Sequence, residues 1–214
     1  MRFIIVFMLV FFSCSLSAIS FAKETFLEGR DYVLLKSPVR PRDASKIEVV
    51  EVFSYHCHHC FQFEPLIESW VKKQPSDVAF VPVHADWAPF MKPLQRGFYT
   101  AVALQLQPKV QLTVFKAFHE NNKLDTAEAW ADLLAPFGKT KEEVLATYNS
   151  FGVTSRINMA NANIRAFQIS GTPTLIVDGR YKISAPSSKG AHEKMLAIAD
   201  FLINKTRTDR KLKK

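Results

Sequence analysis

Two cysteines separated by two histidines form the strongest chemical signal in this chain of 214 residues. Cys57 and Cys60 follow an apolar run and precede a stretch with helical spacing, so they should lie where a helix begins. This spacing brings the two Cα atoms to roughly 5–6 Å, which suits a disulfide that opens and closes with little backbone movement. The helix N-terminus favours a thiolate at Cys57. We therefore predict a redox-active pair in which Cys60 lies deeper and resolves mixed disulfides formed by Cys57.

Three histidines lie next to this pair, and two other roles for the motif remain possible. His56, His58 and His59 could add positive charge or hydrogen bonds, and each unit by which a thiol pKa falls stabilises the thiolate by about 1.4 kcal/mol. One alternative is a structural disulfide, although so small a loop gains little from chain entropy. Another is a zinc or copper site, although zinc usually draws ligands from a second segment. We expect the remaining histidines at ordinary surface or packed positions: His84, His119 and His192.

A second motif, Gly171-Thr172-Pro173, enters the apolar run at residues 174–177. A cis proline at this point would leave the preceding backbone free to pair with an extended substrate. A trans proline that begins the strand is the alternative.

Together, the segments EVFSYHCHHCFQFE and SGTPTLIVDGRY, with a helical block between them, resemble the DsbA family of periplasmic thiol–disulfide oxidoreductases. The resemblance covers residues 25–203 and implies an α/β protein, a thioredoxin fold with an inserted α-helical domain. It implies that Cys57 is the exposed nucleophile, Cys60 the resolving cysteine and Pro173 the cis proline beside them. The implied partners are unfolded secreted proteins with free thiols and a DsbB-like membrane protein that passes electrons to quinone. We expect no cofactor.

Two acidic residues also match the family. Glu51, six residues before Cys57, breaks an apolar run and matches an acidic residue beneath the family's active site. A buried carboxyl there could relay protons to or from Cys60, and a solvent-facing strand position is the alternative. Glu64 aligns with a family acidic residue too, but we expect it on the helix surface.

Two positions depart from the family pattern. The commonest dipeptide between the cysteines is Pro-His, so His59 keeps the expected imidazole while His58 adds a second titratable group. Thr172 stands where many members have Val, and it resembles related isomerases and reductases. We place His58, His59, Pro173 and Glu51 with the cysteines as catalytic residues. Thr172 and Pro173 are expected to bind substrate.

The elements that must position these residues change type along the chain. Strands are predicted at 47–54, 78–84, 174–177 and 180–184, with Pro82 marking a bulge or an edge and Asp178-Gly179 a hairpin turn. Helices are predicted after the cysteines and at 94–106, 109–120, 126–137, 140–148, 154–168 and 187–204. This order predicts a discontinuous thioredoxin-like domain at 23–85 and 155–203, interrupted by a helical domain at 86–154.

Residues 1–22 have the pattern of a cleaved signal peptide. Arg2 precedes an apolar run at 3–12, and small residues lead to Ala22. A membrane-spanning helix needs roughly 20 apolar residues, whereas the core of a secretory signal has about 7–15. An uncleaved anchor and a lipid-modified Cys14 are the alternatives. Cleavage would remove Cys14, and we expect the remaining chain to work in a bacterial periplasm, where disulfides persist.

Composition excludes several classes of protein. The chain is 48% hydrophobic with only three cysteines, which excludes wholesale disorder and a disulfide-stapled scaffold. Its net charge of +8 is concentrated in residues 204–214, where six basic residues and one Asp give +5. We expect this basic tail to be solvated and disordered, with weak membrane attraction as an alternative and no nucleic-acid role.

Three functions remain to be separated. The first is a monomeric oxidase of secreted proteins. The second is a reductase or isomerase of the same fold, although residues 23–46 are too few for the dimerisation domain that isomerases of this kind usually carry. The third is a periplasmic metal-binding protein that uses HCHHC.

Overall fold

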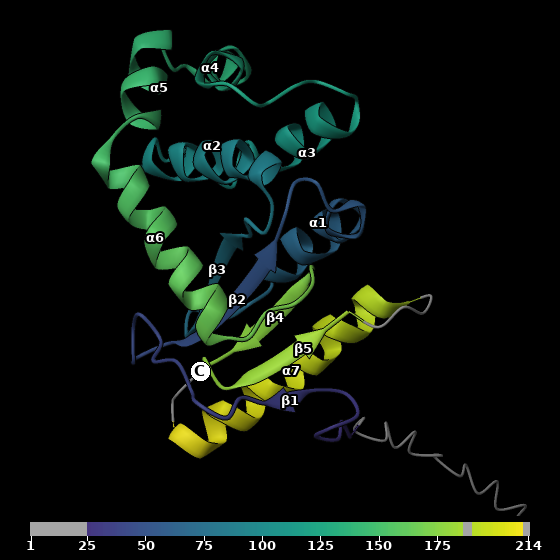
Figure 1. Cartoon of the computed structure of the whole chain (residues 1–214). Helices are drawn as coiled ribbons and strands as arrows, with labels where there is room; N and C mark the ends of the chain where they lie inside the picture. The colour runs from purple at the N-terminus through teal and green to yellow at the C-terminus, as the bar shows by residue number, and fades with distance from the viewer. Residues whose placement is uncertain (1–24, 186–189, 212–214) are drawn as a thin grey trace, which may run out of the picture.

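The computed structural model describes residues 25–185 and 190–211, in which one mixed sheet is covered by helices (Figure 1). The predicted signal peptide, with Cys14, lies outside the described residues. The sheet order is β1-β5-β4-β2-β3, and β2 and β3 are parallel while the other neighbours are antiparallel. The strands are β1 (Val33–Leu34), β2 (Ile47–Phe53), β3 (Val78–His84), β4 (Thr174–Val177) and β5 (Tyr181–Ser184).

Strand β2 is buried along its whole length because both of its faces are covered. Val50 and Val52 belong to a core shared with the inserted helices, whereas Ile47 and Val49 belong to a second core. That second core is closed by α1 (His58–Val71) and α7 (Ala191–Arg210). An apolar run without alternation is what such a strand requires, and the prediction for this strand is confirmed to within one residue.

The other predicted strands are confirmed as well. Pro82 lies on β3, which is an edge strand of the described sheet, and an edge strand is where a residue without an N–H is tolerated. Asp178 and Gly179 both have positive φ, at 58° and 60°, as a tight hairpin turn between β4 and β5 requires. The two-residue strand β1 was not predicted, because two residues carry no period.

Helices α2–α6 form a group beyond the sheet, and α6 runs back towards it (Figure 1). Gly97 of α2 is needed there, since a Cβ would come within 1.8 Å of the Trp130 ring. Thr140 and Glu143 form a capping box: the Thr140 hydroxyl accepts the Glu143 N–H at 3.2 Å, and the Glu143 carboxylate accepts the Thr140 N–H at 2.9 Å. The bounds are α2 (Lys92–Ala103), α3 (Gln111–His119), α4 (Ala127–Leu134), α5 (Lys141–Tyr148) and α6 (Phe151–Ala166), with 3-10 turns at Pro89–Met91 and Ala135–Phe137.

Helix α6 begins three residues earlier than predicted. The Ser150 hydroxyl accepts a hydrogen bond from the Val153 N–H and caps the helix, a signal that a prediction starting at Thr154 overlooked. The domain boundary predicted between residues 154 and 155 therefore falls inside α6.

The prediction of a disordered tail after residue 203 is wrong for the described part of it. Helix α7 continues to Arg210. Its Arg207 Nε donates to Asp77 Oδ2 at 2.7 Å, and Arg210 pairs with Asp178 and donates to two backbone carbonyls. Asp77 and Asp178 lie far from this tail in the sequence. The charge of the tail alone therefore does not predict these ion pairs. Among the described residues, no helix is long and apolar enough to cross a lipid bilayer.

Candidate active site

Cys57 and Cys60 occupy the first turn of α1, at the point where the chain leaves β2. Cys57 is the N-cap, with φ −82° and ψ 111°, and its carbonyl accepts the Phe61 N–H at 3.1 Å. Cys57 is half-buried, whereas Cys60 is fully buried, and both are free thiols. The two sulfurs therefore have very different access to solvent.

This difference is reflected in their acidity. The pKa of Cys57 is lowered to about 5, chiefly by a hydrogen bond from the Cys60 thiol. The Thr172 side chain and the backbone N–H groups of Cys60 and His59 act in the same direction and together outweigh burial. Burial raises the pKa of Cys60 well above its ordinary value, and the neighbouring Cys57 adds to that rise. At neutral pH the arrangement holds one thiolate and one thiol.

The second motif lies against Cys57. The Thr172–Pro173 peptide bond is cis, as predicted. The Thr172 carbonyl oxygen is 3.3 Å from Cys57 Sγ, and Pro173 is buried directly before β4. Because β4 pairs with β2, whose end leads to α1, the sheet itself brings the two motifs together. A second cis proline bond, Gln107–Pro108, was not predicted.

Four histidines lie around these two sulfurs. His58 and His59 are exposed on α1. The His119 ring of α3 stacks on Phe61 at a centroid distance of 4.8 Å and lies 5.6 Å from the His58 ring. The His192 ring of α7 lies 6.4 Å from the His59 ring. The fold thus places His119 and His192 near the cysteine motif, although neither residue is close to the motif in the sequence.

Burial lowers the pKa of both added imidazoles. His58 contributes further to the lowering at His119, and His59 does so at His192. Two histidines remain. His56 is exposed, and its ring lies 4.8 Å from the Phe90 ring. His84 is a packed core residue whose Nε2 accepts the Tyr55 N–H at 3.0 Å. Burial lowers its pKa to about 3. Among the described residues, no three His, Cys, Asp or Glu side chains are arranged to hold a metal ion.

Two carboxyl groups lie beneath the cysteines. Glu51 is only 2% exposed, and burial, then Glu64 and Cys57, raise its pKa well above the ordinary value. Two positions were predicted for Glu51, one buried and one facing solvent, and the structure shows the buried one. Glu64 is 7% exposed, and burial raises its pKa to about 7. The prediction of Glu64 on the helix surface is wrong, since Cys60, Glu64 and Ile67 form the buried stripe of α1.

These carboxyl groups line a cavity of about 290 Å³ between α1, β3 and α3. Gln111 closes one side of it. The Gln111 Nε2 donates to Glu64 Oε2 at 3.3 Å, and the Tyr55 hydroxyl donates to Gln111 Oε1 at 2.7 Å. Neither Gln111 nor Tyr55 was predicted as a site residue, because nothing in the sequence relates α3 to the cysteine helix. The cavity gives the buried carboxyl groups room for proton exchange.

Sequence and structure comparisons agree on the family. A model described as "DSBA-like thioredoxin domain" matches residues 88–192. The protein from Pseudomonas aeruginosa named thiol:disulfide interchange protein DsbA is 39% identical over 194 residues, which is 90% of this chain and 92% of that relative. The protein of the same name from Azotobacter vinelandii is 40% identical over 84% of each chain.

Solved structures extend this likeness to the fold. The crystal structure of Pseudomonas aeruginosa DsbA has a TM-score of 0.81 at 40% identity and covers 87% of this chain and 97% of its own. The structure of the oxidoreductase DsbA from Xylella fastidiosa has a TM-score of 0.79 at 31% identity, covering 85% and 98%. With a thiolate-bearing cysteine pair beside a cis proline, the chain belongs to the DsbA family and is a thiol:disulfide oxidoreductase with a thioredoxin fold and a helical insertion.

Proposed function

We propose that this protein is a dithiol oxidase that donates a Cys57–Cys60 disulfide to newly exported proteins carrying free thiols. The observation that carries the proposal is the low pKa of Cys57 beside the high pKa of Cys60. A stabilised Cys57 thiolate favours the reduced form of the pair, so the disulfide form is a strong acceptor of electrons.

The exchange proceeds in two steps. A substrate thiolate attacks Cys57 Sγ of the disulfide, the Cys57–Cys60 bond breaks, and Cys60 leaves and takes up a proton. A second substrate thiolate then attacks the substrate sulfur of the mixed disulfide, and Cys57 leaves as a thiolate. Two electrons thus pass from the substrate to the cysteine pair, and the substrate gains one disulfide.

Neighbouring residues serve particular steps. Glu51, buried beneath the pair and protonated over an extended pH range, supplies the proton that Cys60 takes up. The backbone N–H of His59 stabilises the Cys57 thiolate as it leaves, and the exposed imidazoles of His58 and His59 can donate further hydrogen bonds at the same end of α1. The backbone before Pro173 is free to pair with an extended substrate segment beside Cys57.

We place the protein in the periplasm as a monomer, reoxidised by a DsbB-like membrane protein that passes electrons to quinone. The family supports this setting, as does the signal-like pattern of residues 1–22. Newly exported proteins are the substrates available in that compartment.

The direction of exchange is tested by unfolding the protein in both redox states. An oxidase of this kind should be more stable when reduced, because its thiolate is stabilised only in the folded protein. Denaturant midpoints measured with and without a reducing agent check this. Equal midpoints, or a more stable oxidised form, would count against an oxidase.

The second candidate is a reductase or isomerase of the same fold. It is favoured by Thr172, which resembles those relatives and which contacts Cys57 through its carbonyl oxygen. Insulin reduction and the reshuffling of a scrambled disulfide protein, measured beside dithiol oxidation, separate the two. Faster reshuffling than oxidation would favour the isomerase.

A further inference from the structure

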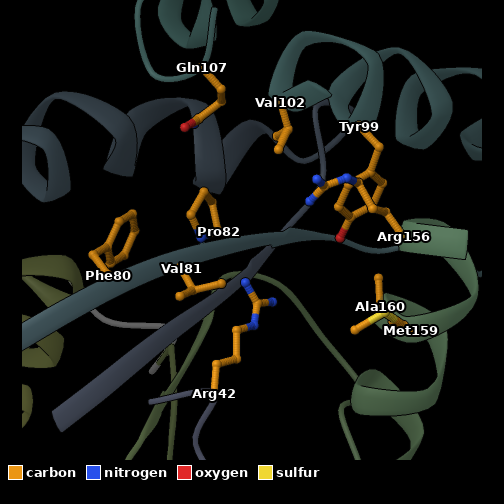
Figure 2. Close-up of a pocket in the computed structure, with 10 residues that line it drawn as sticks. All are labelled: Arg42, Phe80, Val81, Pro82, Tyr99, Val102, Gln107, Arg156, Met159 and Ala160. Carbon is orange, nitrogen blue, oxygen red and sulfur yellow. The ribbon is translucent and has the colours of Figure 1, made fainter. Parts of the chain in front are cut away.

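A second pocket lies beside the edge strand β3, and neither the cysteines nor their buried carboxyl groups line it (Figure 2). Its volume is about 360 Å³, within the usual range of small-ligand sites. Phe80 and Pro82 of β3 form one wall, and Met159 of α6 lies opposite them (Figure 2). The pocket therefore joins the sheet to the helical insertion across a largely apolar space.

Two arginines turn their guanidinium groups into this space from different elements (Figure 2). Arg42 precedes β2, its side chain is 58% exposed, and its Nε lies 3.8 Å from Glu48 Oε2, at the outer limit of an ion pair. Arg156 belongs to α6, and no carboxylate within residues 25–185 and 190–211 forms an ion pair with it. The pocket thus carries positive charge that the described carboxylates leave largely uncompensated.

A phenol lies between these charges. Tyr99 is 7% exposed and lines the pocket from α2. Burial raises its pKa, while Arg42 and Arg156 both act in the opposite direction, so the two guanidinium groups influence the same hydroxyl. Two cations and a hydroxyl that line one pocket together with apolar side chains match the chemistry of an anionic head group on an apolar body.

The acidic cavity beneath the cysteines adjoins this pocket but differs from it in charge. Phe80, Pro82 and Gln107 line both spaces. The acidic cavity contains Glu51 and Glu64, and its one lysine, Lys72, pairs with Glu68 at 2.6 Å. The lysine of that cavity is already paired, so an anion should prefer the arginine pocket.

We propose that the arginine pocket binds a small amphiphilic carboxylate. The head group lies between Arg42 and Arg156, within reach of the Tyr99 hydroxyl. A short aliphatic body lies across the pocket against β3 and α6. Such a ligand would tie the edge of the sheet to the helical insertion.

Titration calorimetry of the purified full chain with octanoate tests this proposal. Octanoate should bind saturably, whereas acetate, which lacks the body, and octan-1-ol, which lacks the charge, should each bind at least about tenfold more weakly. Octan-1-ol binding as tightly as octanoate, or no saturable octanoate binding, would overturn the proposal.

Variants locate the bound probe. Arg156→Gln should weaken octanoate binding about tenfold, since it removes one charge-assisted contact. Lys72→Gln, the matched change in the adjoining cavity, should leave binding unaltered. Both residues are exposed, so both variants should keep the unfolding midpoint and the Cys57 reactivity of the parent. Weaker binding in Lys72→Gln with unchanged binding in Arg156→Gln would place the probe in the wrong cavity and refute the assignment.

Discussion

The two ends of the cysteine site each hold one cysteine sulfur, but in opposite environments. At the outer end, Cys57 has its thiolate stabilised by hydrogen bonds and faces exposed histidines. At the inner end, Cys60, Glu51 and Glu64 are buried, and burial raises the pKa of each. One helical turn separates the two cysteines, yet the pKa of Cys57 is lowered and the pKa of Cys60 is raised.

This contrast shows how a fold directs an exchange reaction. Because only the outer sulfur is accessible and readily ionised, it is the one expected to meet a substrate. Because the inner sulfur holds its proton strongly, it should leave only when a proton is supplied. Burial of the inner end thereby couples electron transfer to proton transfer, and the experiments below test the two ends against each other.

The largest effect is expected from removing either sulfur. Cys57→Ser should abolish oxidation of a dithiol peptide, since no accessible sulfur remains. Cys60→Ser should also prevent turnover, but its Cys57 thiolate should attack added glutathione disulfide, keep one glutathione as a mixed disulfide and release the other as a thiolate, because the resolving thiol is lost. Mass spectrometry under non-reducing conditions checks this difference. A mixed disulfide found at Cys60 in the Cys57→Ser variant would reverse the assigned roles.

Loss of the buried proton donor should have the next largest effect. Glu51→Gln should slow dithiol oxidation by at least about tenfold. The same variant should be more stable than the parent at pH 7. A carboxyl whose pKa is raised by folding destabilises the protein above the pKa of its unfolded state, and this difference should vanish below about pH 4.

The matched control for this variant is Glu68 of α1, which lines the same acidic cavity as Glu51. Glu68→Gln removes an exposed carboxylate, so neither the rate nor the stability should change by more than a small amount. Stopped-flow oxidation and denaturant unfolding measure the two quantities. A slower rate accompanied by lower stability in Glu51→Gln would indicate a structural role rather than proton supply.

The sequence predicted the parts of this site that are adjacent along the chain. Cys57, Cys60 and the strand before them follow from local pattern, and Pro173 and Glu51 acquired their expected positions only through the family resemblance. The prediction for Glu64 was wrong because it relied on the charge of the side chain, which favours the surface. The spacing of Glu64 from Cys60 and Ile67 instead continues the buried stripe of α1. Here the helical period was a better guide than residue type.

The remaining differences arise from contacts between distant segments. His119 and His192 reach the cysteines from α3 and α7, and Gln111 reaches Glu64 across the acidic cavity. Arg207 forms an ion pair with Asp77, a residue 130 positions away in the sequence. Such pairs depend on how helices pack on the sheet, which local periodicity does not specify.

A smaller effect is expected in how the redox potential varies with pH. With Cys57 ionised above about pH 5 and Cys60 protonated, reduction takes up two electrons and one proton. The potential should then fall by roughly 30 mV per pH unit, and by roughly twice that below pH 5, where both thiols bind protons. Equilibration with glutathione buffers of known ratio measures the slope. A slope near 60 mV throughout the range would show that Cys57 is not ionised.

The smallest effect should come from replacing the second histidine with the family's proline. His58→Pro removes one titratable group from the outer end and leaves the inner end intact. An imidazole can donate a hydrogen bond to a nearby thiolate, which a proline ring cannot do. The redox potential of the variant, measured in glutathione buffers, should therefore lie slightly below that of the parent, so that the parent is the stronger oxidant. A variant with the higher potential would instead assign the change to the rigidity of the proline ring at the helix start.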